Sequence, residues 1–299
     1  MPPLRLFAEA GFYICGIFAI FGYKFYIMEN LFDIKGRVVV VTGACGVLGV
    51  TIVKYFAAQG CKVVMLAREH SREQAEGIIA EIKANGGEAM FLATDATDKA
   101  IVAQNCKDVV AAYGRVDVLM NAAGGNMAAA TVPPDKTIFD LDVEAVKKVV
   151  DLNLFGTIIP TLEFAKVMVE QGEGSIINFA SESALRPLTR VAGYGVAKAA
   201  VVNWTKYLAG ELAIKCSEKI RVNAIAPGFI LTKQNHSLLI APDGSLTPRS
   251  HSIIGHTPVG RFLQPEELFG TLHYLASDAS KAVTGTVAIV DGGFDSFSI

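Results

Sequence analysis

The stretch VVVVTGACGVLG, residues 38–49, decides how this chain folds. Its four valines predict a buried β-strand, because a short, continuous run of β-branched apolar residues is typical of strands covered on both faces. The glycines at positions 43, 46 and 49 predict a tight turn, and residues 50–59 place Ile52, Val53, Phe56 and Ala57 on one face of a helix that ends at Gly60. Glycines in such a turn let a pyrophosphate approach the free N–H groups of the helix. The segment therefore predicts a dinucleotide-binding turn, although an ordinary strand-to-helix turn can use the same glycines.

The same alternation of strand and helix continues to the C-terminus. Short apolar runs predict six further strands, at residues 62–67, 89–94, 116–121, 175–180, 220–225 and 286–290. Alternation of this kind implies a parallel sheet with helices on both faces, because each right-handed crossover lays its helix against the sheet. We therefore expect an α/β fold, a doubly wound, parallel, seven-stranded, Rossmann-like sheet in a single domain.

The first 27 residues differ in character from the rest. The apolar run from Ala10 to Tyr23 is short for a spanning helix, which needs about 20 residues. No small-x-small cleavage site follows it, which disfavours a secretion signal. It is either a membrane anchor or a segment upstream of a natural start at Met28. We expect an apolar extension at 1–27 and a catalytic domain at 28–299 in the cytoplasm, with membrane contact only if the extension is an anchor.

The composition limits the kinds of partner. The chain has 299 residues, a formal net charge of −2 and no block of like charges, which argues against nucleic acid and for a small-molecule partner. Its five cysteines form no C-x-x-C pair and its histidines no H-E-x-x-H motif. We therefore expect neither a metal site nor a disulfide framework.

The residues after the second predicted strand bear on the choice between NAD and NADP. An NAD enzyme usually places an acidic side chain there to accept the ribose hydroxyls. Here Ala67 is followed by Arg68, whose planar cation can bind a 2′-phosphate. The position favours NADP, with NAD as the alternative if Arg68 is solvated and Glu69 takes the acidic role.

A tyrosine, a lysine and a serine can supply the chemistry of carbonyl reduction. Of the eight tyrosines only Tyr194 has a lysine, Lys198, four residues later, and Ser181 lies thirteen residues before it. A phenol with a pKa of about 10 is a poor acid at neutral pH, but an ammonium group one helical turn away favours the phenolate, and an oxidised nicotinamide adds a second positive charge. Tyr194 would then be the acid in reduction and the base in oxidation, while Ser181 would hydrogen-bond the substrate oxygen. The alternative is a surface helix pair and a serine that caps a strand end.

Further motifs follow the predicted strands in a fixed order: Asp95-Ala96, Asn121-Ala122-Ala123-Gly124, Asn153, and Pro227-Gly228 with Thr232. With Ser181, Tyr194 and Lys198, this order resembles the short-chain dehydrogenase/reductase family over residues 31–299. The resemblance implies an NAD(P)-dependent oxidoreductase acting on CH–OH groups, and a homo-oligomer, usually a tetramer. It also implies that Asp95 holds the adenine edge, that residues 121–124 line the cofactor cleft, that Pro227 and Thr232 lie by the nicotinamide, and that Asn153 anchors a water linking Lys198 to solvent.

The glycine turn departs from the family's usual T-G-x-x-x-G-x-G spacing. Its middle glycine is Gly46, and Val47 stands where a glycine is expected. The shifted spacing resembles the extended branch of the family, which includes epimerases and dehydratases. We still expect the turn to hold the cofactor, through Gly43, Cys45, Gly46, Val47, Leu48 and Gly49.

Two segments bear on the substrate. Arg186 and Arg190 lie between the serine and the tyrosine, and residues 228–258 form a long polar segment. Together with Gly124-Gly125-Asn126, Phe139-Asp140-Leu141-Asp142 and the shifted turn, they resemble the D-mannonate oxidoreductases (fructuronate reductases) of the family. A sugar acid has a carboxylate that suits a guanidinium fork. We expect Arg190 or Arg186 to clamp it, with Asn126 and Gln234 as further substrate contacts; for each arginine the alternative is a helix-end or intersubunit ion pair.

Three other functions compete with this interpretation. A non-catalytic nucleotide sensor commonly lacks the tyrosine or the lysine, and both are present here. A nucleotide-sugar epimerase or dehydratase usually has a larger C-terminal substrate domain. A 3-oxoacyl or polyol reductase keeps the reaction and changes the substrate, and the arginines and polar segment argue mildly against an acyl chain.

Overall fold

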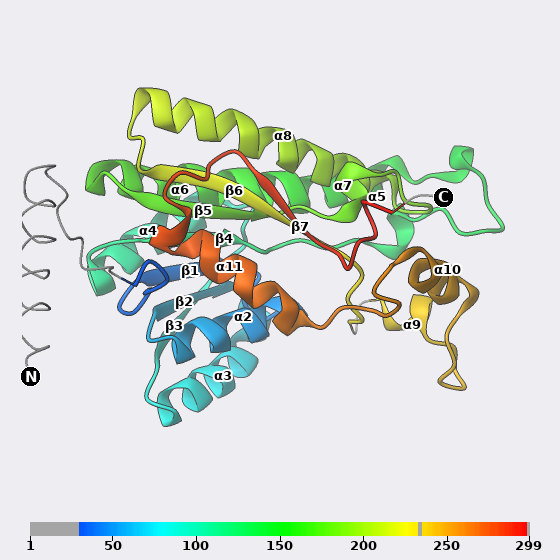
Figure 1. Ribbon diagram of the computed structural model, residues 1–299, viewed down its shortest axis with the longest axis horizontal. Coiled ribbons are helices and arrows are strands. Elements are labelled where there is room, and N and C mark those ends of the chain that lie inside the picture. The colour runs from blue at the N-terminus through cyan, green and yellow to red at the C-terminus, as the bar shows by residue number, and fades with distance from the viewer. Residues whose placement is uncertain (1–29, 233–234, 298–299) are drawn as a thin grey trace, which may run out of the picture. The chain divides into compact units, whose positions relative to one another are not determined.

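The computed structural model describes residues 30–232 and 235–297. The expectations for residues 1–27 and for Gln234 lie outside the described residues. The described residues from Phe32 to Phe297 form one compact unit, whose elements are labelled in Figure 1.

All seven predicted strands are present in one parallel sheet, in the order β3-β2-β1-β4-β5-β6-β7. Their bounds are β1 (Val38–Thr42), β2 (Lys62–Ala67), β3 (Glu88–Ala93), β4 (Val118–Asn121), β5 (Gly174–Phe179), β6 (Ile220–Pro227) and β7 (Val287–Val290). No boundary of these strands differs from its prediction by more than two residues. The doubly wound α/β fold is therefore confirmed.

Helices connect the strands. They are α2 (Val47–Ala58), α3 (Arg72–Ala84), α4 (Lys99–Tyr113), α5 (Val143–Val150), α6 (Gly156–Gln171), α7 (Glu182–Leu185), α8 (Ala192–Lys215), α9 (His236–Leu239), α10 (Pro248–His256) and α11 (Phe269–Ala276). A π-helical turn, Asp151–Phe155, joins α5 to α6. Helix α2 begins at Val47, three residues before its predicted start, and buries the apolar face expected from the sequence.

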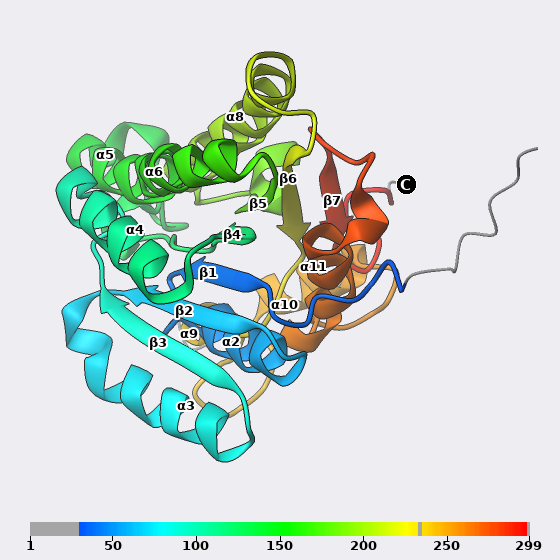
Figure 2. The same ribbon diagram turned by 90° about the vertical axis from the view of Figure 1, so that its left-hand side faces the viewer.

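The helices form two layers, one on each face of the sheet, as Figure 2 shows. Helices α2, α3 and α11 pack on one face, and α4, α6 and α8 pack on the other. Successive strand residues point to opposite faces, so Val39 and Val41 join the first core while Val38 and Val40 join the second. Every residue of β1 is buried for this reason, which explains the unbroken valine run.

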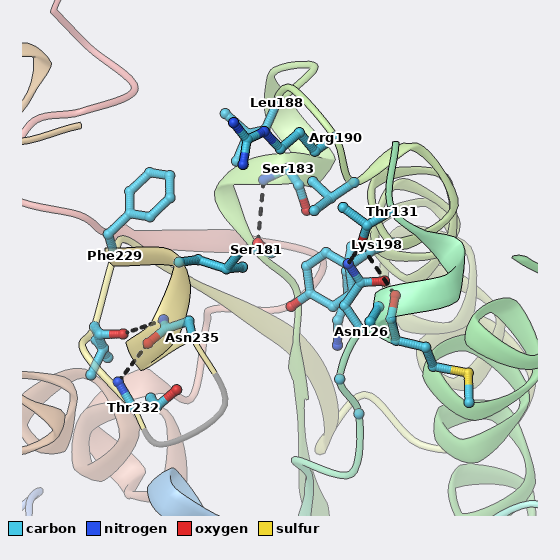
Figure 3. Close-up of a pocket in the computed structure, with 18 of the residues that line it drawn as sticks. Asn126, Thr131, Ser181, Ser183, Leu188, Arg190, Lys198, Phe229, Thr232 and Asn235 are labelled. Atoms are coloured by element: carbon cyan, nitrogen blue, oxygen red, sulfur yellow. Dashed lines mark hydrogen bonds between the residues drawn. The ribbon is translucent and has the colours of Figure 1, made fainter. Parts of the chain in front are cut away.

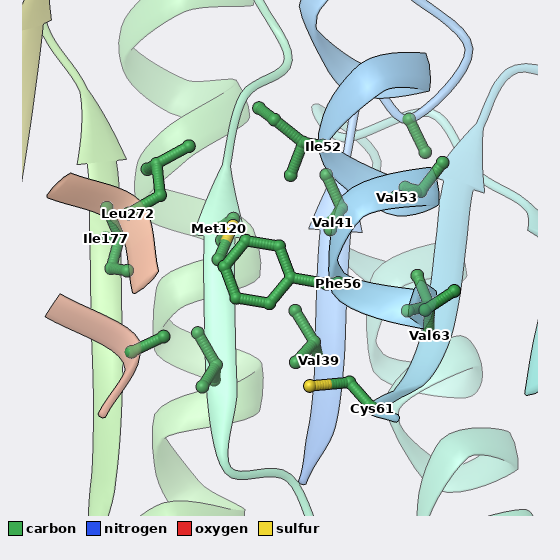
Figure 4. Packing of buried hydrophobic residues seen from close by; sticks show 14 of the residues in the cluster. Val39, Val41, Ile52, Val53, Phe56, Cys61, Val63, Met120, Ile177 and Leu272 are labelled. Atoms are coloured by element: carbon green, nitrogen blue, oxygen red, sulfur yellow. The ribbon is translucent and has the colours of Figure 1, made fainter. Parts of the chain in front are cut away.

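The ring of Phe56 lies between α2 and the sheet (Figure 4). It is fully buried and belongs to the same cluster as Val39, Met120 and Leu272. Truncating such a side chain to alanine typically costs about 3–5 kcal/mol. This packing fixes the position of α2, and with it the glycine turn from which α2 begins.

Within the described residues, one continuous helical run, Val143–Gln171, is long and apolar enough to cross a membrane. Half of its most apolar window is buried inside the domain. Its second part, α6, packs Phe164 and Met168 against the sheet. The run is a core helix of this fold.

The strand order reverses between β1 and β4. The chain leaves β1 toward β2 and β3, then returns to place β4 on the other side of β1. Thr42 at the end of β1 is consequently paired with Asn121 at the end of β4. In open α/β sheets, ligands bind beyond the carboxyl ends of the strands at this point of reversal. The loops after β1 and β4 therefore position the candidate site.

Candidate active site

The turn after β1 leaves little or no room for side chains at its three glycines. Gly43 has a φ of +65°, and a Cβ there would lie 2.8 Å from the Cα of Ala123. A Cβ at Gly49 would lie 2.3 Å from the carbonyl oxygen of Gly43, and one at Gly46 would lie 3.2 Å from the same atom. The turn is closed by a hydrogen bond from the Gly46 N–H to the Gly43 carbonyl, at 2.9 Å. Close backbone approach therefore excludes a side chain at Gly43 and Gly49 and leaves little space for one at Gly46.

The shifted middle glycine sits at the start of α2. Gly46 is the residue before the helix, has extended backbone angles and has no side chain to cap the helix. Val47 is the first helical residue and lines the cleft. The first N–H groups of α2 consequently lack a side-chain partner at the capping position, which leaves the positive end of the helix available to a phosphate. Cys45 does not line the cleft, and burial raises the pKa of its thiol.

Arg68 and Asp95 follow the neighbouring strands β2 and β3. The Asp95 carboxylate accepts hydrogen bonds from the backbone N–H and the hydroxyl of Thr97, which lower its pKa, and Arg68 lowers that pKa further. Glu69 binds Arg72 through two hydrogen bonds, of 2.6 and 2.9 Å. Arg68 is exposed and forms no ion pair within the described part of the chain. The acidic alternative, Glu69, is thus engaged by another residue, while Arg68 remains available.

The residues at the end of β4 form part of the cleft and of the buried hydrogen-bond network beside it. The fully buried Asn121 donates hydrogen bonds to the Thr161 hydroxyl and to the side-chain oxygen of Asn178, at 2.7 and 2.8 Å. Ala122 and Gly124 line the cleft. A Cβ at Gly124 would lie 2.7 Å from Oδ1 of Asn153 and 3.3 Å from Nζ of Lys198. Glycine at this position therefore lets the loop lie against both side chains.

Ser181, Tyr194 and Lys198 converge on the same cleft. Ser181 follows β5 and is the residue before α7, while Tyr194 and Lys198 lie one turn apart on α8. A hydrogen bond joins the side chains of Ser181 and Tyr194. The Lys198 ammonium lies 5.7 Å from the centre of the Tyr194 ring and donates a 2.7 Å hydrogen bond to the carbonyl of Phe179. Figure 3 shows Ser181 between Phe229 and Lys198.

Burial governs the acid–base properties of these groups. It raises the pKa of Tyr194, and the hydrogen bond with Ser181 opposes that effect. It lowers the pKa of Lys198 to about 8, since the ammonium group has no carboxylate beside it in the described residues. Lys198 is therefore mainly protonated at pH 7, and its positive charge lies 5.7 Å from the centre of the Tyr194 ring.

Asn153 lies in the π-helical turn between α5 and α6 and is fully buried. Its amide donates to the carbonyls of Gly125 and Val149, at 2.7 and 2.8 Å, and its oxygen accepts from the Gly125 N–H at 3.1 Å. Asn153 thus holds the loop after β4 in place. Insertions of this kind in helices are frequent at functional sites.

The cleft has a volume of about 910 Å³. The residues expected in the site that line it are Gly43, Gly46, Val47, Leu48, Gly49, Ala122, Gly124, Asn126, Ser181, Arg190, Tyr194, Lys198, Pro227, Gly228 and Thr232. Those that the structure places outside its lining are Cys45, Arg68, Asp95, Ala96, Asn121, Ala123, Asn153 and Arg186.

The structure separates the two candidate arginines. Arg186 forms an ion pair with Asp295, at 2.7 Å, and does not line the cleft. For Arg186 the structure favours the ion-pair alternative over a substrate clamp, because its guanidinium is held by the C-terminal segment. Arg190 lines the cleft, and so does Arg249 of α10. In the sequence, Arg249 is one residue of the polar segment 228–258.

Glu182, directly after Ser181, has no counterpart among the expected site residues. Its side chain is 2% exposed, and neither carboxyl oxygen has a hydrogen-bond partner in the described structure. Burial, with smaller contributions from Asp291 and Asp295, raises its pKa to about 8, and Arg186 opposes this. A buried carboxyl that stays protonated at neutral pH had no signal in the sequence.

Comparisons with known proteins agree with this geometry. A family model described as enoyl-(acyl carrier protein) reductase matches residues 43–295. The uncharacterized oxidoreductase UxuB of Bacillus subtilis is 39% identical over 90% of this chain and 98% of its own. The 3-oxoacyl-[acyl-carrier-protein] reductase of Synechocystis is 36% identical over 88% of this chain and 99% of its own.

A solved structure is also similar. It is a protein from Haemophilus influenzae, provisionally described as a D-mannonate oxidoreductase, with bound NAD. It is 35% identical, covers 89% of this chain and 97% of its own, and superposes with a TM-score of 0.83. The family model alone covers most of the chain, and these relatives extend the match over nearly all of the described domain. The chain therefore belongs to the short-chain dehydrogenase/reductase family and is an oxidoreductase of that family.

Proposed function

We propose that the protein transfers a hydride between NAD(P)H and the carbonyl carbon of a sugar acid, with Ser181, Tyr194 and Lys198 as its catalytic residues. The observation that carries the proposal is that these three side chains and the glycine turn line one cleft at the point of strand reversal. The cofactor fits that turn, because its glycines leave a cradle that any Cβ would fill and α2 presents its N-terminus there. When bound, the nicotinamide supplies the hydride in reduction and accepts it in oxidation.

The protein's own residues handle the proton. In reduction, Tyr194 donates its phenolic proton to the alkoxide that develops on the substrate oxygen, and in oxidation the phenolate takes that proton back. Ser181, already hydrogen-bonded to Tyr194, holds the substrate oxygen beside it. The charge of Lys198 stabilises the phenolate left after donation. Asn153 holds the loop after β4, and the water that it would anchor to Lys198 stays a prediction.

We propose NADP as the preferred cofactor. Arg68 is available and Glu69 is engaged by Arg72, which supports recognition of a 2′-phosphate. Asp95 would bind the adenine edge. Four further residues that we expect to support the cofactor site lie outside the cleft lining: Cys45, Ala96, Asn121 and Ala123. The NAD bound in the similar Haemophilus influenzae structure makes NAD the alternative.

The substrate proposal rests on charge in the cleft. Arg190 lines it, and the description of the Haemophilus influenzae relative names a sugar acid. Asn126 is a further candidate contact, as is Gln234, which lies outside the described residues. Apolar side chains such as Phe229, Leu188 and Leu239 also line the cleft, which keeps a 3-oxoacyl substrate, as in the Synechocystis relative, as the second candidate.

We also propose a cytoplasmic homo-oligomer, by family analogy a tetramer. Apolar side chains of α6 and α8 are exposed, among them Leu162 and Ile214. Burial of such side chains between copies would remove apolar area from water. Light scattering of the purified chain tests this, and a monomer at micromolar concentration would contradict it.

The catalytic proposal is tested with Tyr194→Phe. This change removes the proton donor and little else, so we expect turnover to fall by about 10²- to 10⁴-fold while the affinity for NADPH stays within about threefold. The matched control is Tyr207→Phe, which removes the hydroxyl of an exposed tyrosine on the same helix and should leave turnover unchanged. Near-normal turnover by Tyr194→Phe would refute the mechanism.

The substrate is identified by a screen of uronates, aldonates, polyols and acyl thioesters with NADPH, NADH and their oxidised forms. Turnover of fructuronate or mannonate supports the sugar-acid proposal. Turnover confined to acyl thioesters would replace it with the second candidate.

A further inference from the structure

Two arginines from separate segments meet at the cleft. Arg190 belongs to the loop between α7 and α8, and Arg249 belongs to α10, in the segment after β6. Both line the cleft. The Arg249 guanidinium donates a 2.8 Å hydrogen bond to the hydroxyl of Thr189, the neighbour of Arg190. This contact joins the segment after β6 to the loop that follows Ser181.

Neither guanidinium is neutralised by the protein. Within residues 30–232 and 235–297, Arg190 and Arg249 form no ion pair. Burial lowers the pKa of Arg249, and the charge of Arg190 lowers it further. The lining also holds two carboxylates, Asp140 and Asp142, and among the described residues neither forms an ion pair with Arg190 or Arg249. Asp140 accepts hydrogen bonds from Thr137, and Asp142 accepts one from the Ala145 N–H. Two cations that repel each other in a half-buried site are stabilised by an anion that binds both.

The backbone at Arg190 is also unusual. It has a φ of 74°, and it is the one non-glycine residue with positive φ in the described chain. Its carbonyl accepts a 3.1 Å hydrogen bond from the Val132 N–H, which ties its loop to the loop after β4. Residues held in such sparsely populated conformations cluster at ligand clamps. Figure 3 shows Arg190 on the same side of the cleft as Leu188 and Ser183.

We propose that Arg190 and Arg249 together bind the carboxylate of the substrate, and that this contact holds α10 against the loop after Ser181. The inference rests on the proposed function and names the feature by which that site selects its substrate. The two guanidinium groups bind the carboxylate oxygens of the substrate. Ser181 and Tyr194 hold the reacting oxygen, which lies on another carbon of the same substrate. Neutral polyols lack the group that both arginines bind.

Steady-state kinetics with three probes tests the proposal. D-mannonate carries a carboxylate, D-mannitol is neutral, and D-mannitol 1-phosphate carries a phosphate instead. We expect Arg249→Ala and Arg190→Ala each to raise KM for D-mannonate by about 10- to 100-fold, as for hydrogen bonds to charged groups, with a much smaller change in kcat. In the double variant, the rise in KM should be smaller than the product of the two single rises, because both arginines bind the same carboxylate. Turnover of D-mannitol should change by less than about threefold in either single variant.

The control is Arg261→Ala. Arg261 is an exposed arginine that pairs with Glu267 and lies outside the cleft lining, so its removal should leave KM for D-mannonate unchanged. If Arg249→Ala lowered kcat/KM equally for D-mannonate and D-mannitol, the clamp would be overturned. If the enzyme bound D-mannitol 1-phosphate more tightly than D-mannonate, the assignment of the clamp to a carboxylate would be overturned.

Two readouts separate this proposal from the proposed function. Hydrogen exchange in α10 should slow when D-mannonate and cofactor bind the wild type and stay fast in Arg249→Ala. Calorimetric titration of D-mannonate into the enzyme–cofactor complex reports binding without turnover, and the absence of binding would overturn the clamp. If the enzyme oxidised D-mannitol but not D-mannonate, and Tyr194→Phe abolished this activity, hydride transfer would be supported and the clamp would be overturned.

Discussion

Replacing Glu182 by glutamine should make the protein more stable, and the gain should grow with pH. The side chain is buried without a hydrogen-bond partner, close enough to Asp291 and Asp295 for their charges to raise its pKa. Its pKa is about 8, against an ordinary value of 4.5. Glutamine has nearly the same shape and cannot ionise. The substitution therefore removes the cost of the buried charge while leaving the packing in place.

The sign and size of the effect follow from proton linkage. Between pH 4.5 and pH 8, Glu182 is ionised in the unfolded chain and protonated in the folded one, so unfolding releases a proton and stability falls as pH rises. The slope is about 1.4 kcal/mol per pH unit, and the pKa difference of about 3.5 corresponds to about 5 kcal/mol as an upper limit. Above pH 8 both states are ionised and the contribution becomes constant. Glu182→Gln should thus match the wild type near pH 5 and exceed it by several kcal/mol at pH 8.

Chemical unfolding at a series of pH values measures this. Urea or guanidinium curves between pH 5 and pH 9, followed by circular dichroism at one protein concentration, give the free energy of unfolding of each variant. The control is Glu218→Gln, which changes an exposed carboxylate and should shift the free energy by less than about 0.5 kcal/mol at every pH. If the difference between Glu182→Gln and the wild type does not change between pH 5 and pH 8, Glu182 does not hold a proton in the folded state and the reasoning is refuted.

Two further substitutions test the cofactor site. Arg68→Asp should weaken NADPH binding about 10- to 100-fold more than NADH binding, because it replaces the 2′-phosphate partner by a repelling carboxylate; an unchanged ratio of the two dissociation constants would remove Arg68 from that role. Gly49→Ala places a methyl group 2.3 Å from the Gly43 carbonyl oxygen, so the turn must shift, and we expect the affinity for both cofactors to fall at least tenfold with a loss of about 1–3 kcal/mol in stability. Gly77→Ala on α3, where a Cβ meets nothing within 4 Å, is its matched control and should stabilise by about 0.5–1 kcal/mol without affecting cofactor binding, as measured by fluorescence titration.

Local patterns in the sequence were sufficient for the sheet and the core of the site. The valine run of β1 predicted a strand buried on both faces, and the glycines that follow predicted a turn in which the structure leaves no space for a Cβ. The spacing of Ser181, Tyr194 and Lys198 placed the tyrosine and lysine on one face of α8 and the serine at the end of β5. These features depend on residues close together in the chain, where periodicity and chain geometry determine the outcome.

Only the tertiary structure decided which charged side chains lie at the cleft and which are paired or buried beside it. Arg186 and Arg190 are indistinguishable in sequence. In the structure the C-terminal segment supplies Asp295 to Arg186, while Arg190 has a positive φ and accepts a hydrogen bond from Val132 in the loop after β4. Arg249 contacts Thr189, in the loop between α7 and α8, from sixty residues away. Glu182 is kept protonated by burial and by carboxylates more than a hundred residues later. Such pairs form because the carboxyl ends of parallel strands bring distant loops together, and the packing of those loops leaves no periodic trace in the chain.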